Sequence, residues 1–225
     1  MYQIVTGPLL WLSFAIFFGG CLFHVINYFK GLDSRVDRVT YKVNTRHGVR
    51  AALRSIGVWI LPFGTRSWRV KPGYTLLFYL FHVGALSVPL FASGHAVIIT
   101  QRWGLNWPSM PDMLADALTL GVMLAVFGIF IRRLILPEVR IISSGWDWLT
   151  LAISAAPFFT GFIAYHQLGS GHFWTLAHIL FGEILLIAVP FTKLSHMVLF
   201  FCTRIQIGMD FGIKRGGMKS PGFPW

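Results

Sequence analysis

Long runs of apolar residues alternate with short polar segments along this chain. Residues 1–29, 72–101 and 148–182 contain no Asp, Glu, Lys or Arg. A helix needs about 20 mostly apolar residues to span a bilayer, and five segments meet this requirement. The sequence therefore predicts an all-α membrane protein with residues 1–225 as a single integral membrane domain, whose five transmembrane helices lie at about 7–29, 74–100, 114–136, 148–165 and 173–203.

The basic residues lie mostly on alternate loops between these segments. The predicted loop 30–73 holds ten Lys and Arg, and the predicted tail 204–225 holds four more. By contrast, residues 101–113 contain a single Arg. Because positively charged loops stay on the cytoplasmic side of a membrane, we expect an N-out, C-in topology with a cytoplasmic loop and a cytoplasmic tail.

The overall composition agrees with this interpretation and excludes two classes of protein. The 225 residues are 55% hydrophobic and 12% charged, yet the formal net charge is +11. The positive charge lies next to the predicted spans and no DNA- or RNA-binding motif accompanies it, so a nucleic-acid partner is not expected. Cys21 and Cys202 are too few to build an Fe–S cluster or a structural zinc site.

The predicted cytoplasmic loop contains an amphipathic segment, residues 44–60. Its apolar residues recur at helical spacing along one face, and its arginines form a second stripe. Such a helix suits the headgroup layer of a membrane, where it contacts lipid; it could also dock a cytoplasmic partner, and the two roles are compatible. The apolar stripe comprises Val49, Leu53, Ile56 and Ile60, and the basic stripe comprises Arg46, Arg50 and Arg54.

Five of the eight histidines fall within the predicted spans, where an ionisable side chain is costly and therefore a functional candidate. Imidazole is also a common axial ligand of b-type haem. We interpret His24 as a polar contact, because it has no evident partner. The other four are His82 and His95 in the second span and His178 and His196 in the fifth.

These four histidines form two pairs at matching depths. His178 and His196 are 18 residues apart, which on one straight helix is five whole turns and about 27 Å. His82 and His95 are 13 residues apart, a rotation of about 220°, and Pro89 between them could kink the helix. Because the two spans run in opposite directions, we expect the pairs to be His82 with His196 near the cytoplasm and His95 with His178 near the outside.

Small residues and one acid close to these histidines complete the candidate site. Gly84, Gly94 and Gly182 could make room for a flat macrocycle. Glu183 is a lone acid within the fifth span. It could relay protons, or it could hydrogen-bond a neighbouring helix, and we favour the second.

The motifs around these histidines resemble a known family. FHVGAL with a downstream GH in the second span, and PFTKLSH closing the fifth, resemble the gamma subunit of respiratory nitrate reductases. The spacing of 18 matches that family, whereas the spacing of 13 is longer. The long basic loop is more similar to the b-type cytochrome subunit of transmembrane redox complexes in sulfate-reducing bacteria.

This resemblance implies a di-haem b subunit of a bacterial cytoplasmic membrane complex that serves sulfate respiration. Its four histidines would bind two haem irons in the pairs given above. Lys193 and Arg204 could contact haem propionates, or they could simply extend their charged ends to the membrane interface. The implied partners are a cytoplasmic Fe–S subunit resembling heterodisulfide reductase, a periplasmic multihaem cytochrome c, and a quinone, for which menaquinone is a candidate. The residues at the level of the family's quinone site are Arg102, Tyr165, His166 and His172.

Electron transfer across the membrane is the function that this resemblance implies, and a quinone or quinol oxidoreductase activity could accompany it. The principal alternative is a non-catalytic membrane anchor that recruits a soluble complex through the basic loop. A small-ion transporter fits less well, because the spans lack inverted repeats and paired carboxylates.

Overall fold

The computed structural model describes residues 2–33 and 45–214 of the chain. By their contacts, the residues divide into two compact units. The first unit comprises Met1–Trp11 and Leu76–Leu185, and the second comprises Leu12–Thr75 and Leu186–Trp225. The prediction of a single domain over residues 1–225 stays a prediction.

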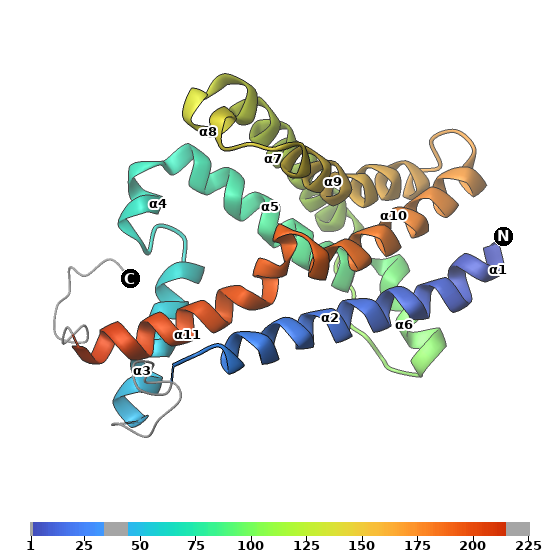
Figure 1. The fold of residues 1–225 in the computed structure, drawn as a ribbon. Coiled ribbons are helices and arrows are strands. Elements are labelled where there is room, and N and C mark those ends of the chain that lie inside the picture. Colours follow the sequence, from blue (N-terminus) through green and yellow to red (C-terminus); the bar gives the residue numbers. More distant parts are fainter. Residues whose placement is uncertain (1, 34–44, 215–225) are drawn as a thin grey trace. The chain divides into compact units, whose positions relative to one another are not determined.

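The described residues form helices and no strand (Figure 1). In chain order the elements are α1 (Tyr2–Ile4), η1 (Val5–Leu9), α2 (Leu10–Lys30), α3 (Thr45–Ile60), α4 (Arg66–Val70), α5 (Pro72–Phe91), α6 (Ser93–Trp103), α7 (Asp112–Ile135), α8 (Pro137–Ile141), α9 (Gly145–Tyr165), α10 (Gly171–Phe191), η2 (Lys193–Ser195) and α11 (His196–Lys214).

Five helices in the described part of the chain are long and apolar enough to cross a membrane: Tyr2–Lys30, Pro72–Phe91, Asp112–Ile135, Gly145–Tyr165 and Gly171–Phe191. This confirms the predicted all-α membrane fold. The amphipathic segment is also confirmed as a helix, α3, although Asn44 lies outside the described residues. The N-out, C-in orientation stays a prediction.

Two of the predicted spans were wrong in extent, because each is interrupted. The second span, expected at 74–100, ends as a helix at Phe91, and Ala92 adopts an extended conformation (φ −60°, ψ 140°) before α6 begins. The fifth span, expected at 173–203, ends at Phe191, and Thr192 is extended (φ −124°, ψ −177°) before η2 and α11. The distances and rotations that a straight helix would give between His82 and His95, and between His178 and His196, therefore do not apply.

In the first unit, glycines allow α5 and α7 to pack closely. A Cβ at Gly84 would lie 2.9 Å from the Leu118 carbonyl oxygen, and one at Gly121 would lie 2.7 Å from the Leu80 side chain. Such close approach of backbones is typical of membrane helices, which lack a hydrophobic drive to associate. Gly84 thus serves helix packing, and the expectation that it makes room for a macrocycle was wrong.

In the second unit, α3 packs along α11 (Figure 1). A Cβ at Gly208 would lie 2.6 Å from the Cα of Ala52, so the two helix backbones are nearly in contact there. The Arg204 guanidinium stacks 4.8 Å from the centre of the Trp59 ring. Beyond α3, the Thr75 hydroxyl donates to the Trp68 carbonyl over 2.8 Å and fixes the short α4 against the start of α5.

Candidate functional site

The imidazole rings of His95 and His178 face each other in the first unit. Their Nε2 atoms lie 3.5 Å apart, and the two ring planes differ by 6°. The ring centroids are 5.8 Å apart, farther than the Nε2 atoms, so the rings meet through their Nε2 edges. The structure thus brings together the two histidines predicted to form the outer pair.

His178 is held in place by α9. Its Nδ1 donates to the Pro157 carbonyl over 2.9 Å. A Cβ at Gly161, one turn later on α9, would lie 2.8 Å from both Cε1 and Nδ1 of this ring. Pro157 and Gly161, which both lie within the predicted span 148–165, thus form the contact surface, or seat, that positions the His178 ring.

His95 is held by the helix break at Ala92. The last four carbonyls of an α-helix have no partner within it and must be satisfied from outside. Ending α5 at Phe91 exposes such carbonyls inside a predicted span, and the following residues satisfy all of them. Two of these carbonyls accept from backbone N–H groups: Val88 from Ala92 over 3.0 Å, and Phe91 from Met110 over 2.8 Å. The other two accept from side chains: the Pro89 carbonyl from His95 Nδ1 over 2.9 Å, and the Leu90 carbonyl from Trp107 Nε1 over 2.7 Å.

All four histidines predicted as axial ligands direct Nδ1 at a backbone carbonyl oxygen. Nδ1 of His82 lies 2.8 Å from the Phe78 carbonyl, and Nδ1 of His196 lies 2.8 Å from the Lys193 carbonyl. Because a carbonyl can only accept, each Nδ1 carries the hydrogen and Nε2 carries the lone pair in the neutral ring. His82 belongs to the first unit and His196 to the second, so their pairing stays a prediction.

His24 uses its ring in the opposite way. Its Nε2, rather than its Nδ1, lies 2.7 Å from a backbone carbonyl, that of Pro190. This carbonyl belongs to the last turn of α10 and therefore needs a donor from outside the helix. The contact agrees with the interpretation of His24 as a polar contact.

The His95–His178 arrangement fits a metal ion with two axial imidazoles. Two Nε2 lone pairs facing each other repel unless a cation lies between them. Metal–imidazole bonds of about 2.0–2.1 Å would separate the two nitrogens by about 4 Å, somewhat more than the 3.5 Å observed. Within residues 2–33 and 45–214 no group of three or more His, Cys, Asp or Glu could hold a metal ion, so the remaining ligands would have to come from the cofactor itself.

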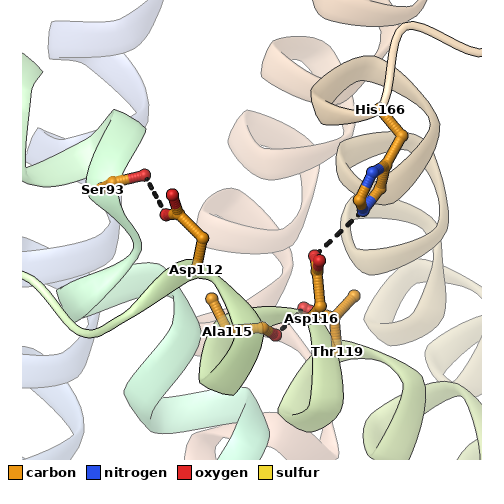
Figure 2. A network of polar contacts seen from close by, with 6 residues as sticks. All are labelled: Ser93, Asp112, Ala115, Asp116, Thr119 and His166. Carbon is orange, nitrogen blue, oxygen red and sulfur yellow. Dashed lines mark hydrogen bonds and ion pairs between the residues drawn. The ribbon is translucent and has the colours of Figure 1, made fainter.

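A network of polar contacts joins α7 to α6 and to the C-terminal end of α9 (Figure 2). The Ser93 hydroxyl donates to Asp112 over 2.8 Å, and His166 Nε2 lies 3.0 Å from Asp116. Ser93 is two residues before His95 on α6, so its contact with α7 helps to set the position of that helix. These acids were not singled out from the sequence, because their role depends on which helices meet.

The four residues predicted at a quinone site separate into two groups. Arg102 donates to the Thr6 carbonyl over 3.2 Å, and the ring of His172 lies 6.3 Å from that of Tyr2. Tyr165 hydrogen-bonds Asp112, and its neighbour His166 contacts Asp116. Among the described residues these contacts do not join the two groups, and a quinone site stays a prediction.

Among the predicted propionate contacts, Arg204 has the more informative environment. Burial lowers the pKa of its guanidinium, yet arginine stays charged at neutral pH. In the described part of the chain no carboxylate forms an ion pair with it. A half-buried cation stacked on Trp59 fits an anionic group supplied from outside the chain. Lys193 lies in η2, and its carbonyl orients His196.

Glu183 is buried in α10, with 2% of its surface exposed. Neither carboxyl oxygen has a hydrogen-bond partner among the described residues. The expectation that Glu183 hydrogen-bonds a neighbouring helix was therefore wrong.

Comparison with known proteins finds a relative that aligns with the whole chain. No protein-family model matches this sequence, and no solved structure gives a significant match. A protein of Nitratidesulfovibrio vulgaris, strain Hildenborough, is 52% identical to it over 226 residues, and the alignment covers 100% of both chains. The chain therefore belongs to the same family as this Nitratidesulfovibrio vulgaris protein.

Proposed function

We propose that this protein is the di-haem b membrane subunit of a respiratory redox complex. It would transfer electrons across the membrane between a quinone pool or periplasmic cytochrome c and a cytoplasmic Fe–S subunit. Haem, when bound, supplies a one-electron carrier through its iron, and the protein supplies ligands, position and a low-dielectric surrounding. The observation that carries the proposal is the meeting of His95 and His178 through their Nε2 edges.

The hydrogen bonds of these two rings leave no proton for the space between them. Pro89 and Pro157 each accept from Nδ1, so both neutral rings present an acceptor to the other. A pair of histidines that served only to connect two helices would place a donor opposite an acceptor. Metal-binding histidines almost always direct their second nitrogen at a carbonyl or carboxylate, which fixes the tautomer, and this arrangement supports axial ligation.

The same criterion supports His82 and His196 as the ligands of the second, cytoplasmic-side haem. Both rings direct Nδ1 at a carbonyl of their own segment, whereas His24 uses Nε2. Arg204 would bind a haem propionate, because it is a half-buried cation that forms no ion pair within the described residues. His196 begins α11, and Arg204 lies eight residues later on the same helix.

The partners are proposed from the sequence resemblance together with the distribution of charge. The basic loop and tail would face the cytoplasm, where an Fe–S subunit resembling heterodisulfide reductase could dock. A quinone, such as menaquinone, or a multihaem cytochrome c would exchange electrons on the opposite side, close to the His95–His178 pair. This would place the protein in the cytoplasmic membrane of a bacterium that respires sulfate.

Purification of the full-length protein from haem-replete cells tests the proposal. We expect a red preparation whose dithionite-reduced spectrum has the α band of b-type haem, with about two haems per chain by pyridine haemochrome. A folded, colourless preparation would overturn the proposal and would favour the non-catalytic membrane anchor.

A further inference from the structure

Helix α3 has three distinct faces, and the structure fixes what lies against one of them. Its buried residues are all small and recur at helical spacing: Gly48, Ala51, Ala52 and Ser55. This face packs on α11, where Gly208 allows near-contact of the two backbones. At such close approach the side chains of the two helices cannot move past each other, so the structure fixes which face of α3 contacts α11.

The second face is apolar and exposed. Val49, Leu53 and Ile60 recur at helical spacing and are 47%, 64% and 50% exposed. The residues of α3 that are covered within the protein are the small ones, so this apolar stripe stays available to another partner. Exposed large apolar residues that recur along one face of a helix indicate an interaction surface.

The third face is cationic. Arg46, Arg50 and Arg54 occupy successive turns, and α3 contains no acidic residue. At about 100° per residue, the centres of the small, apolar and basic faces lie roughly 90–150° apart around the helix. The apolar and basic faces are therefore neighbours, and both lie away from α11.

We propose that α3 lies in the headgroup layer of an anionic membrane, with its apolar face in the acyl boundary and Arg46 and Arg50 binding lipid phosphates. Both arginines are exposed. An apolar face bordered by arginines is the arrangement by which helices bind anionic interfaces. This inference is independent of haem binding.

The position of α3 in the chain favours lipid over an acidic protein as the occupant. Only residues 61–71 separate α3 from α5, which is long and apolar enough to cross the membrane. That connection also carries exposed apolar residues, with Leu61 at 61% and Val70 at 66% exposed. An acidic protein surface would neutralise the arginines but would leave this apolar surface in water.

A spin label at residue 53 tests the proposal in the full-length protein. The L53C variant, made in a C21A/C202A background, would be labelled and reconstituted into nanodiscs of zwitterionic lipid with or without anionic phosphatidylglycerol. We expect the label to collide with molecular oxygen, which concentrates in lipid, and to be protected from a neutral nickel chelate in water. The protection should be greater with the anionic lipid.

Removing charge from the basic face should weaken this protection. R46Q and R50Q should each lower the ratio of lipid-inserted to water-exposed label by about fivefold in anionic nanodiscs, and neither should matter in zwitterionic ones. The matched control is R140Q, which removes an exposed arginine of α8 and should change nothing.

Two outcomes would overturn the proposal. One is a label equally accessible to the nickel chelate in both lipids, and the other is protection that appears only when an acidic soluble protein is added. Because the signal does not depend on haem, a colourless protein could still pass this test, and a haem-loaded protein could fail it.

Discussion

His95 and His178 meet through Nε2 atoms 3.5 Å apart, and each ring donates from Nδ1 to the carbonyl of a proline. Both prolines lie inside apolar helices, Pro89 in α5 and Pro157 in α9. The backbone thus fixes the tautomer and direction of two side chains from different helices. Because backbone carbonyls set the directions of both rings, a change in helix packing should disturb the proposed haem site, just as removal of either histidine should.

Removal of single histidines should separate the two proposed haems. We expect H178A to lose only the haem bound by His95 and His178, and H196A to lose only the haem bound by His82 and His196. Each variant should retain about one haem per chain by pyridine haemochrome. H24A is the matched control and should keep both haems, because His24 directs Nε2 at the Pro190 carbonyl.

Loss of both haems from H178A, with the protein still folded by circular dichroism, would contradict the assigned pairing. Loss of a haem from H24A would contradict the use of the hydrogen-bonded nitrogen as a criterion for ligation.

Gly161 offers a test of the seat of His178 that leaves every histidine in place. In G161A the new methyl group would lie 2.8 Å from Nδ1 and Cε1 of His178. The ring would have to move, and its bond to the Pro157 carbonyl would weaken, at an expected cost of about 1–3 kcal/mol. We expect reduced occupancy of the outer haem and an altered low-spin EPR signal.

The control for G161A is G145A on the same helix, where a Cβ meets nothing within 4 Å. A G161A protein with the haem content and EPR signal of the unmodified protein would show that His178 does not depend on this seat.

The sequence was sufficient to predict the number and nature of the membrane helices, because an apolar run of about 20 residues rarely forms anything but a membrane-spanning helix. It was not sufficient to locate the breaks at Ala92 and Thr192. Neither break has a proline or glycine at the break itself, and Pro89 lies three residues before the first. Each break is stabilised by polar groups distant in sequence, such as Trp107 for the Leu90 carbonyl and His24 for the Pro190 carbonyl.

The orientation of α3 illustrates a second limit. The periodicity of its apolar residues predicted a helix correctly, but it does not reveal which face is covered. Coverage is decided by Gly208, more than 150 residues away, since close packing against a glycine favours Ala51 and Ala52 over Leu53. The sequence correctly indicated that His95 and His178 are partners, whereas the positions of their rings depend on the break before α6 and on α9, which periodicity does not reveal.

Glu183 provides a prediction about stability. Its carboxyl group is buried with no hydrogen-bond partner in the described part of the chain, and a buried unsatisfied polar group costs roughly 1–3 kcal/mol. We expect E183L to raise the free energy of unfolding by about that amount, and E183Q to leave it nearly unchanged. Unfolding in mixed micelles by titration with a denaturing detergent would measure both. An E183L protein that is less stable than E183Q would mean that the carboxyl group has a stabilising partner.

Gly208 should be essential to the attachment of α3. In G208V the new Cβ would lie 2.6 Å from the Cα of Ala52 and 2.7 Å from the Ala51 carbonyl oxygen, and these backbone atoms cannot turn aside. We expect the free energy of unfolding to fall by about 1–3 kcal/mol and hydrogen exchange in residues 45–60 to accelerate. The control is G57A on α3, where a Cβ meets nothing within 4 Å; it should stabilise the helix by roughly 0.5–1 kcal/mol. Unchanged exchange in G208V would mean that α3 is held by contacts other than its small-residue face.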